Sequence, residues 1–444
     1  MIVITLILGL LLRLISLNQS FWLDEATSAT VVKTLNFGDI ITKFAPGDFH
    51  PPLYYLTLKL WILPFGVSEV WVRALSILFA LGTIYVIYLI GKKLKGENLG
   101  TIAAILVATA PLHVYYSQEA RMYSMETFLI SLAVYLFLKE RWVFFSIILA
   151  LVGLTDYLPL LIIPTFWIFA VLSKKSIPWF TKLILSHVPL ALCYVVWSPY
   201  LLNQLRAGFG VRDSGSLWWQ VLGSPSLKEA VLVPVKFMIG RISFDSNIVY
   251  GLVVGLTGLL FAFLFFKSKK YLKQNFLLLL WLFVPVVLAF IISFKISVFS
   301  YFRFLFVLPA YYLILALGIS SLKKKFYPIV FLLIIFLNLA FSLAYLLNTK
   351  FQREDWKGLV STIGSEPVVF PAKSQREAFL YYNNKPNIIE PEKLTKNQKI
   401  LWLSRYVQDI TDPKDLTRLK IEELGYKKTN DYNFNGVSVW KYEK

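Results

Sequence analysis

The chain begins with the apolar run MIVITLILGLLLRLISL (residues 1–17), and the polar stretch FWLDEATSAT (residues 21–30) follows it almost at once. The run has no basic segment before its apolar core and no small-residue cleavage site, so it predicts a retained membrane span and not a cleaved signal peptide. Two adjacent carboxylates, Asp24 and Glu25, therefore stand where the first span leaves the membrane.

Further apolar runs recur along the chain, which is 57% hydrophobic and 16% aromatic over 444 residues. Soluble proteins average well below this apolar content, and runs of about 18 or more residues indicate membrane helices. The formal net charge of +19 would suggest nucleic acid in a soluble protein, but lysine-rich cytoplasmic loops explain it here, so no nucleic-acid partner is expected. The single cysteine, Cys193, lies in an apolar run, which excludes disulfides and thiolate metal sites.

Basic clusters between the runs predict the topology. They lie at 92–95, 139–141, 174–175, 267–273 and 323–325. If all face the cytoplasm, an even number of spans must separate neighbouring clusters, which gives about eleven transmembrane helices, a cytoplasmic N-terminus and an extracytoplasmic C-terminus. The expected spans are 1–18, 70–91, 98–116, 122–138, 142–156, 157–173, 177–199, 248–266, 276–294, 304–320 and 327–347.

Two long outer loops, 19–69 and 200–247, interrupt the alternation of spans. Within the first, the short piece 52–63 is amphipathic and is expected to lie along the membrane surface. The second contains SLWWQ (216–220), whose tryptophans suit the headgroup zone.

From residue 349 the sequence becomes mixed polar and charged. The pattern predicts strands at 367–372, 399–406 and 436–443, and helices at 374–382 and 412–426. We therefore expect a transmembrane domain over 1–348, followed by a small extracytoplasmic α/β domain over 349–444.

The informative polar groups fall on the outer face of this topology. They are Asp24, Glu25, His50, Glu119, Arg121, Asp156, Tyr157 and Arg303. Carboxylates and arginines that converge on one membrane face indicate a site for an anionic ligand with an exposed reactive end.

Several charged groups at or near the span ends also have a simpler explanation. Asp24 could be a solvated loop residue, and Glu119 and Arg121 could form a surface ion pair worth under ~1 kcal/mol. Arg13 is expected to reach toward lipid headgroups. Glu126, one turn into the fourth span, is harder to dismiss because an unpaired charge there is costly, and we expect an arginine partner.

Four motifs considered together favour a function. They are LDEA (23–26), HPPLYY (50–55), YSQEARMYS (116–124) and YFRFLFVLP (301–309). In this combination the chain resembles the membrane-embedded glycosyltransferases of the C superfamily (GT-C). The branch is that of the protein O-mannosyltransferases and the lipid A aminoarabinose transferase, families 39 and 83. FQREDWKGLV (351–360) also looks like the opening of the outer domain found in many bacterial and archaeal members.

The resemblance implies a GT-C fold and transfer of a sugar from a polyprenyl-phosphate donor to a hydroxyl outside the cytoplasm. By this resemblance Asp24 is the general base, which takes the acceptor's proton as its oxygen attacks the anomeric carbon with inversion. Arg303 first, and Arg121 second, are the cations for the departing polyprenyl phosphate. Asp156 and Tyr157 are expected at the donor.

Glu25 and Glu119 would orient the acceptor or the sugar, or hold a divalent ion. The aminoarabinose transferase has a lysine where His50 stands, so His50 is assigned to a metal or a sugar hydroxyl instead of a phosphate. Glu25, His50 and Glu119 are thus the candidates for a divalent metal, the one cofactor considered. The acceptor, whether glycan, lipid or protein, does not carry over from the family.

Other classes of protein also place charges in membranes. A polyprenyl-linked oligosaccharide ligase or polymerase shares the expected topology and differs in donor and acceptor. A transporter or lipid flippase is disfavoured because the charges collect at one face and no repeat is found. A scaffold that merely presents 349–444 explains neither Asp24 nor Arg303.

Overall fold

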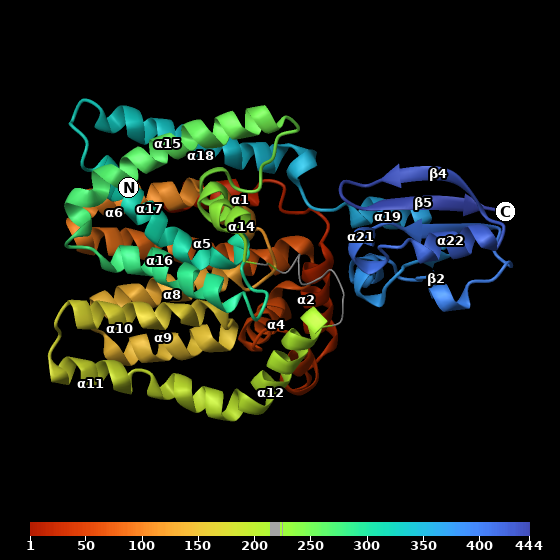
Figure 1. The fold of residues 1–444 in the computed structure, drawn as a ribbon, viewed down its shortest axis with the longest axis horizontal. Helices are drawn as coiled ribbons and strands as arrows, with labels where there is room; N and C mark the ends of the chain where they lie inside the picture. Colours follow the sequence, from red (N-terminus) through yellow and green to blue (C-terminus); the bar gives the residue numbers. More distant parts are fainter. Residues whose placement is uncertain (214–222, 224) are drawn as a thin grey trace.

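Helices that lie side by side make up most of residues 1–348, and a small α/β region lies at one end of them (Figure 1). The computed structural model describes residues 1–213, 223 and 225–444. The main helices are α1 (Ile2–Leu14), α2 (Leu23–Thr34), α4 (Leu53–Phe65), α5 (Glu69–Lys95), α6 (Glu97–Thr109), α7 (Pro111–Ser117), α8 (Tyr123–Leu138), α9 (Trp142–Thr155), α10 (Ile163–Leu172), α11 (Ile177–Leu185), α12 (Val188–Asp213), α14 (Leu227–Ile239), α15 (Asn247–Leu272), α16 (Leu277–Ile292), α17 (Leu308–Ile319) and α18 (Tyr327–Leu347).

The lengths and composition of these helices are those of a multi-pass membrane protein. In the described residues, five helical stretches are long and apolar enough to cross a bilayer, and six further apolar helices are shorter. The pair α6 and α7 passes the same test as one span bent by 61°. The bend falls where Pro111 begins α7, because proline lacks the N–H that would continue the helix. The number of crossings, about eleven, stays a prediction from the positive-inside rule.

Most expected spans coincide with helices, and two regions differ in detail. The run 177–199 is divided between α11 and α12, which break at 186–187. Within the expected second outer loop, 200–247, the structure has the end of α12 and the helix α14. The stretch SLWWQ (216–220) lies outside the described residues.

Glycines let several helices approach closely. A Cβ at Gly91 of α5 would stand 2.7 Å from the Cα of Gly100 on α6. A Cβ at Gly318 of α17 would stand 2.8 Å from the carbonyl carbon of Leu264 on α15. Small residues at such crossings are typical of membrane helix pairs, whose association depends on close packing.

The C-terminal α/β region (residues 349–444) contains a five-stranded sheet of order β2-β1-β3-β5-β4. Strands β1 (Val368–Val369), β2 (Ile388–Ile389) and β3 (Ile400–Ser404) pair in parallel, and β4 (Lys427–Asn433) and β5 (Ser438–Glu443) pair antiparallel. The helices of the region are α19 (Trp356–Ile363), α20 (Glu377–Tyr382), α21 (Gln408–Thr411) and α22 (Leu416–Glu423). The predicted strands contain β1, β3 and β5. Strand β4 was missed because nearly all its side chains are exposed, which removes the alternating pattern.

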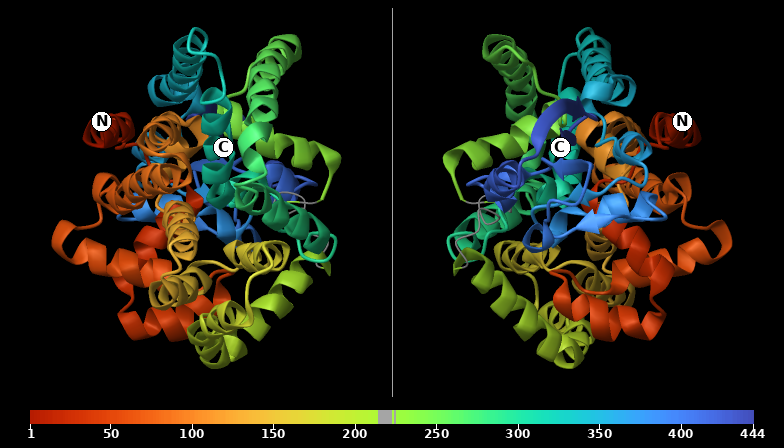
Figure 2. Two further views of the ribbon diagram at one scale, coloured as in Figure 1. Left: turned by 90° about the vertical axis from the view of Figure 1, so that its left-hand side faces the viewer. Right: turned by 90° about the vertical axis from the view of Figure 1, so that its right-hand side faces the viewer.

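This region packs against the N-terminal part of the chain. The end views place it over the middle of the helical part (Figure 2). The ring of Phe21, just before α2, meets the ring of Tyr381 on α20 edge-on at 5.2 Å. The Phe21 N–H donates to the Tyr382 hydroxyl at 2.7 Å. The sheet region is thus in direct contact with the segment that carries Asp24 and Glu25.

Candidate active site

Asp24 and Glu25 lie in the first turn of α2, where the helix N-terminus favours negative charge. Successive residues on a helix point about 100° apart, so the two carboxylates cannot face the same surroundings. The Glu25 side chain is fully buried, whereas the Asp24 side chain is 41% exposed. The pair therefore divides into one buried acid and one accessible acid.

Arg73 of α5 holds the buried acid in a two-pronged ion pair. Its Nε donates to Glu25 Oε1 at 2.9 Å and its Nη2 donates to Oε2 at 2.6 Å. The Ala120 N–H also donates to Oε1, at 2.7 Å. Burial pushes the pKa of Glu25 up, but the charges of Arg73 and Arg353 outweigh burial and hold this pKa below its ordinary value. Glu25 is thus an ionised anchor within the protein.

Arg73 also fixes the backbone that leads into α2. Its remaining hydrogen bonds go to the carbonyls of Leu17, Gln19 and Ser20, at 2.8, 2.7 and 3.0 Å. The side chain is 1% exposed, so the network is shielded from water. Arg73 was missed by the sequence analysis, although a lone arginine inside the expected span 70–91 was a signal that could have found it.

Arg121 brings two of the quoted motifs to Asp24. Its Nη2 lies 3.8 Å from Asp24 Oδ2, and its Nη1 donates to the Tyr55 hydroxyl at 3.0 Å. Tyr55 in turn donates to Asp48 at 2.7 Å. The YSQEARMYS and HPPLYY stretches, far apart in the chain, therefore meet around the one exposed carboxylate of the pair.

Glu119 faces inward, toward a residue that follows the last span. Arg353 Nη1 lies 3.0 Å from Glu119 Oε2, and Arg353 Nε lies 3.7 Å from Glu25 Oε2. Burial raises the pKa of Glu119 above its ordinary value, and the charge of Arg353 opposes that rise. Arg353 belongs to the FQREDWKGLV motif, whose pattern alone assigns this arginine no role.

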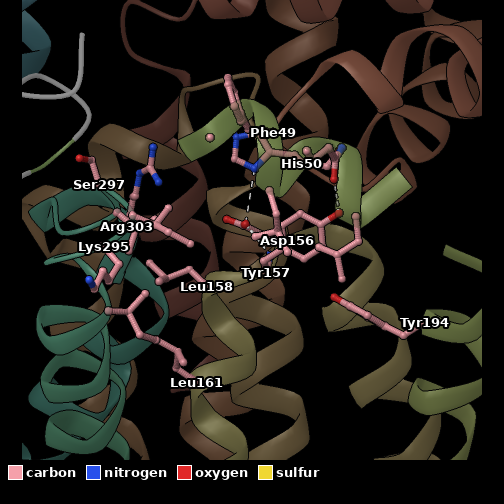
Figure 3. Close-up of a pocket in the computed structure, with 17 residues that line it drawn as sticks. Phe49, His50, Asp156, Tyr157, Leu158, Leu161, Tyr194, Lys295, Ser297 and Arg303 are labelled. Atoms are coloured by element: carbon pink, nitrogen blue, oxygen red, sulfur yellow. Dashed lines mark hydrogen bonds and ion pairs between the residues drawn. The ribbon is translucent and has the colours of Figure 1, made fainter. Parts of the chain in front are cut away.

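The other expected site residues lie around a cavity of about 280 Å³ (Figure 3). His50 Nδ1 lies 3.4 Å from the buried Asp156 Oδ1, and Arg303 lines the same cavity. Tyr157 accepts from Trp197 Nε1 at 2.7 Å and donates to Gln204. Sequence reasoning had named four of these residues, and the structure brings them together: His50, Asp156, Tyr157 and Arg303.

A second cation, Lys295, lines the cavity beside Arg303. It was missed, although a lysine at the predicted outer end of a span departs from the cytoplasmic bias of basic residues. Much of the remaining wall is apolar and comes from Phe49, Leu158, Leu161, Leu201, Leu205, Ile292, Ile296 and Val298. The cavity thus combines a cationic side with an apolar lining, as an amphipathic anion requires.

The two groups of residues are neighbours in the fold. Residues 48–55 connect them, since Asp48 and Tyr55 belong to the Arg121 network while His50 lines the cavity. On the other side, the ring of Phe302, next to Arg303, packs edge-on against Tyr123 at 5.6 Å. The exposed carboxylate and the cavity are therefore linked through shared neighbours in the fold.

Two expectations about charged residues in spans were wrong. Arg13 does not reach toward headgroups: it is fully buried, donates to the carbonyls of Gly9 and Ala108, and contacts His113 Nδ1 at 2.8 Å. Its polar partners lie on α1, α6 and α7, so the side chain is held inside the helical part. Glu126 has no arginine ion pair within the described residues; its buried carboxyl group lies near Asp156.

The candidate metal ligands do not gather. Across the described residues, no group of three or more His, Cys, Asp and Glu side chains is arranged to hold a metal ion. Of the three candidates, Glu25 and Glu119 face arginines, and His50 faces Asp156. Glu25, His50 and Glu119 therefore do not form a metal site with one another.

Comparisons with known proteins agree with this architecture. Residues 49–202 match the model of the dolichyl-phosphate-mannose-protein mannosyltransferase family, a stretch that contains His50, Arg121 and Asp156. An uncharacterized protein of Aquifex aeolicus (strain VF5) is 33% identical over 140 residues, which is 30% of this chain and 33% of that protein. The match thus spans about a third of that relative's length.

Among solved structures, the chain is similar in fold to ArnT from Cupriavidus metallidurans bound to undecaprenyl phosphate. The TM-score is 0.62 at 12% identity, over 99% of this chain and 97% of that one. The Archaeoglobus fulgidus oligosaccharyltransferase AglB, in complex with an inhibitory peptide and a dolichol-phosphate, gives 0.56 at 13% identity, over 99% of this chain and 73% of that one.

These findings confirm the resemblance stated from the sequence. The chain is a polytopic α-helical membrane protein with the GT-C fold. Residues 49–202 match the mannosyltransferase family model, and the whole chain shares its fold with ArnT.

Proposed function

We propose that this protein is a membrane glycosyltransferase that moves a sugar from a polyprenyl-phosphate donor to a hydroxyl acceptor. The observation that carries the proposal is one accessible carboxylate, Asp24, beside a cavity with two cations and an apolar wall. Two neighbouring acids, Glu25 and Glu119, are buried and lie against Arg73 and Arg353. Asp24 also lies beside an arginine, 3.8 Å from Arg121, but its side chain is 41% exposed and can therefore meet a substrate.

The cavity suits the donor. Arg303 and Lys295 would bind the phosphate, because charge-assisted hydrogen bonds to phosphate are among the strongest that a protein makes. The apolar wall would take the first units of the lipid chain, and the His50–Asp156 pair and Tyr157 would contact sugar hydroxyls. The undecaprenyl phosphate bound by ArnT and the dolichol-phosphate bound by AglB support a donor of this class.

The transfer would be a single displacement. The acceptor oxygen attacks the anomeric carbon while Asp24 accepts its proton, and the bond from that carbon to the phosphate oxygen breaks with inversion. The electron pair of that bond leaves on polyprenyl phosphate, whose added charge Arg303 and Lys295 would stabilise. Arg121, 3.8 Å from Asp24, would orient the carboxylate toward the acceptor.

The proposed orientation places the N-terminus in the cytoplasm and the site, with the C-terminal α/β region, outside. Residues 1–348 would form the transferase domain and 349–444 an extracytoplasmic domain. A glycan, a lipid or a protein could supply the acceptor hydroxyl. The basic clusters between the spans support this orientation.

Mass spectrometry of cell-envelope glycans, lipids and proteins, with and without the gene, tests the proposal even when the sugar is unidentified. A glycosylated species should disappear on deletion and return with the wild-type gene. Asp24→Asn should not restore it, although the purified variant should still bind undecaprenyl phosphate. The matched control is Asp39→Asn, because Asp39 lies in the same loop and its partners among the described residues are the exposed Lys43 and Asn36. Full restoration by Asp24→Asn would refute the assignment of the base.

A further inference from the structure

Arg353 connects the C-terminal α/β region to the buried acids of the site. It follows the last helix of the helical part, yet its side chain is only 2% exposed. It lies against Glu119 and Glu25, its Nη1 donates to the Tyr115 hydroxyl at 3.3 Å, and its guanidinium stacks on the Tyr115 ring. A residue from outside the helical part thus completes an ion cluster inside it.

The charges of this cluster balance. Glu25 and Glu119 contribute two negative charges, and Arg73 and Arg353 contribute two positive charges. All four side chains are at most 2% exposed, so water cannot replace a missing partner. Removal of one member of a buried ion cluster leaves an uncompensated charge, which is strongly unfavourable.

The neighbours of Arg353 hold the same segment of chain. The Arg353 N–H donates to Gln19 Oε1 at 2.9 Å, and the Lys357 N–H donates to Ser20 Oγ at 3.2 Å. Together with the bond from Phe21 to Tyr382, these contacts fix residues 19–21 from the C-terminal side. The segment that they fix leads directly into α2.

From these contacts we infer that Arg353 is a positioning residue for the transfer reaction. By neutralising Glu25 and Glu119 it holds the first turn of α2 in one rotation, and that rotation directs Asp24 outward toward the acceptor. The inference rests on the proposed function for the role of Asp24. It makes the C-terminal α/β region a necessary part of the active site.

The test compares Arg353→Gln, Arg353→Lys and the double variant Arg353→Gln/Glu119→Gln in the full chain. The matched control is Arg418→Gln, because Arg418 is an arginine of the same region whose pairs with Asp415 and Glu422 lie at the surface. Three quantities are measured: restoration of the glycosylated species in the deletion strain, affinity for undecaprenyl phosphate, and hydrogen exchange of the α2 amides.

We expect Arg353→Gln to lower transfer by about 100-fold, since small displacements of a catalytic group have effects of that size. Undecaprenyl phosphate affinity should stay within about twofold, because its cavity uses other cations, and α2 should exchange faster than in Arg418→Gln. Arg353→Lys should retain part of the activity. The double variant should transfer at least about tenfold faster than Arg353→Gln, because it removes the unpaired charge of Glu119. A purely steric role of Arg353 would not explain such a recovery.

Wild-type transfer and unchanged α2 exchange in Arg353→Gln would overturn the inference. So would a transfer defect that Glu119→Gln does not relieve while α2 exchange stays normal. A different result would separate the two proposals. If Asp24→Asn transfers normally, the assignment of Asp24 as the base fails, and the hydrogen exchange of α2 alone then decides whether Arg353 holds that helix.

Discussion

Loss of Arg303 should weaken binding of the lipid phosphate more than any other single change in the cavity. Arg303 lines the cavity from the segment Tyr301–Val307, with Lys295 next to it. A hydrogen bond to a charged group contributes about 1.5–3 kcal/mol, and about 1.4 kcal/mol corresponds to a tenfold change in affinity. Arg303→Ala should therefore raise the Kd for undecaprenyl phosphate by about 10- to 100-fold.

Related variants of the two cations should weaken lipid-phosphate binding to different extents. Lys295 is exposed, so water screens its charge and Lys295→Ala should cost less than Arg303→Ala. Arg303→Lys should recover only part of the affinity, because an ammonium group keeps the charge and loses the two-pronged geometry. Each variant is titrated with undecaprenyl phosphate in nanodiscs and the bound lipid is quantified by native mass spectrometry.

Arg206→Ala is the control for nonspecific loss of positive charge. Arg206 lies on α12 next to Leu205, which is part of the cavity wall. The Arg206 side chain is exposed and does not line the cavity. An unchanged Kd in Arg303→Ala, or an equal rise in Arg206→Ala, would refute the assignment of the phosphate to Arg303.

Three further predictions concern the helical part and the buried cluster. Gly318→Ala should push α17 away from the α15 backbone and lower the midpoint of thermal unfolding. Gly255→Ala is the control, because a Cβ there meets open space and should leave the midpoint unchanged. Equal midpoints in the two variants would contradict the packing argument. Arg73→Leu should destabilise the protein by about 3–5 kcal/mol, because it leaves a buried carboxylate without its partner, and chemical denaturation of the detergent-solubilised protein measures this. In Arg353→Gln the transfer rate relative to wild type should fall as pH rises. Burial already raises the pKa of Glu119, and loss of Arg353 raises it further, so protonation relieves the unpaired charge only at lower pH. Glu119 also faces the charges of Glu25, Arg121 and Arg241, so addition of Glu119→Gln, which should flatten this trend, is the check that Glu119 is the responsible group.

Local patterns identified much of the fold. The apolar runs coincide with helices because bilayer thickness sets the length of a membrane helix. That length can be counted directly as a run of apolar residues. Strands β3 and β5 were found because their side chains alternate or are buried, and β4 was missed because KKTNDYN carries no such pattern. The break at Pro111 was readable in principle, since proline cannot continue a helix in the usual way.

The candidate site was predictable only in part. His50, Asp156 and Arg303 were named from the sequence, and the structure brings them to one cavity. Lys295 was passed over because a single lysine beside a span has several ordinary explanations. Arg353 was passed over because nothing near it in the chain indicates that its side chain is buried. It packs against Tyr115, a residue 238 positions earlier in the sequence.

The sequence by itself determined that this is a many-helix membrane protein with acids and arginines at the ends of its helices, because hydropathy and charge are properties of short segments. Only the tertiary structure decided which of two adjacent acids is free to react. Asp24 and Glu25 are chemically almost equivalent in the bare sequence. Their roles diverge because Arg73, 48 residues away in the chain, and the still more distant Arg353 bury and neutralise one of them, and the turn of the helix leaves the other exposed.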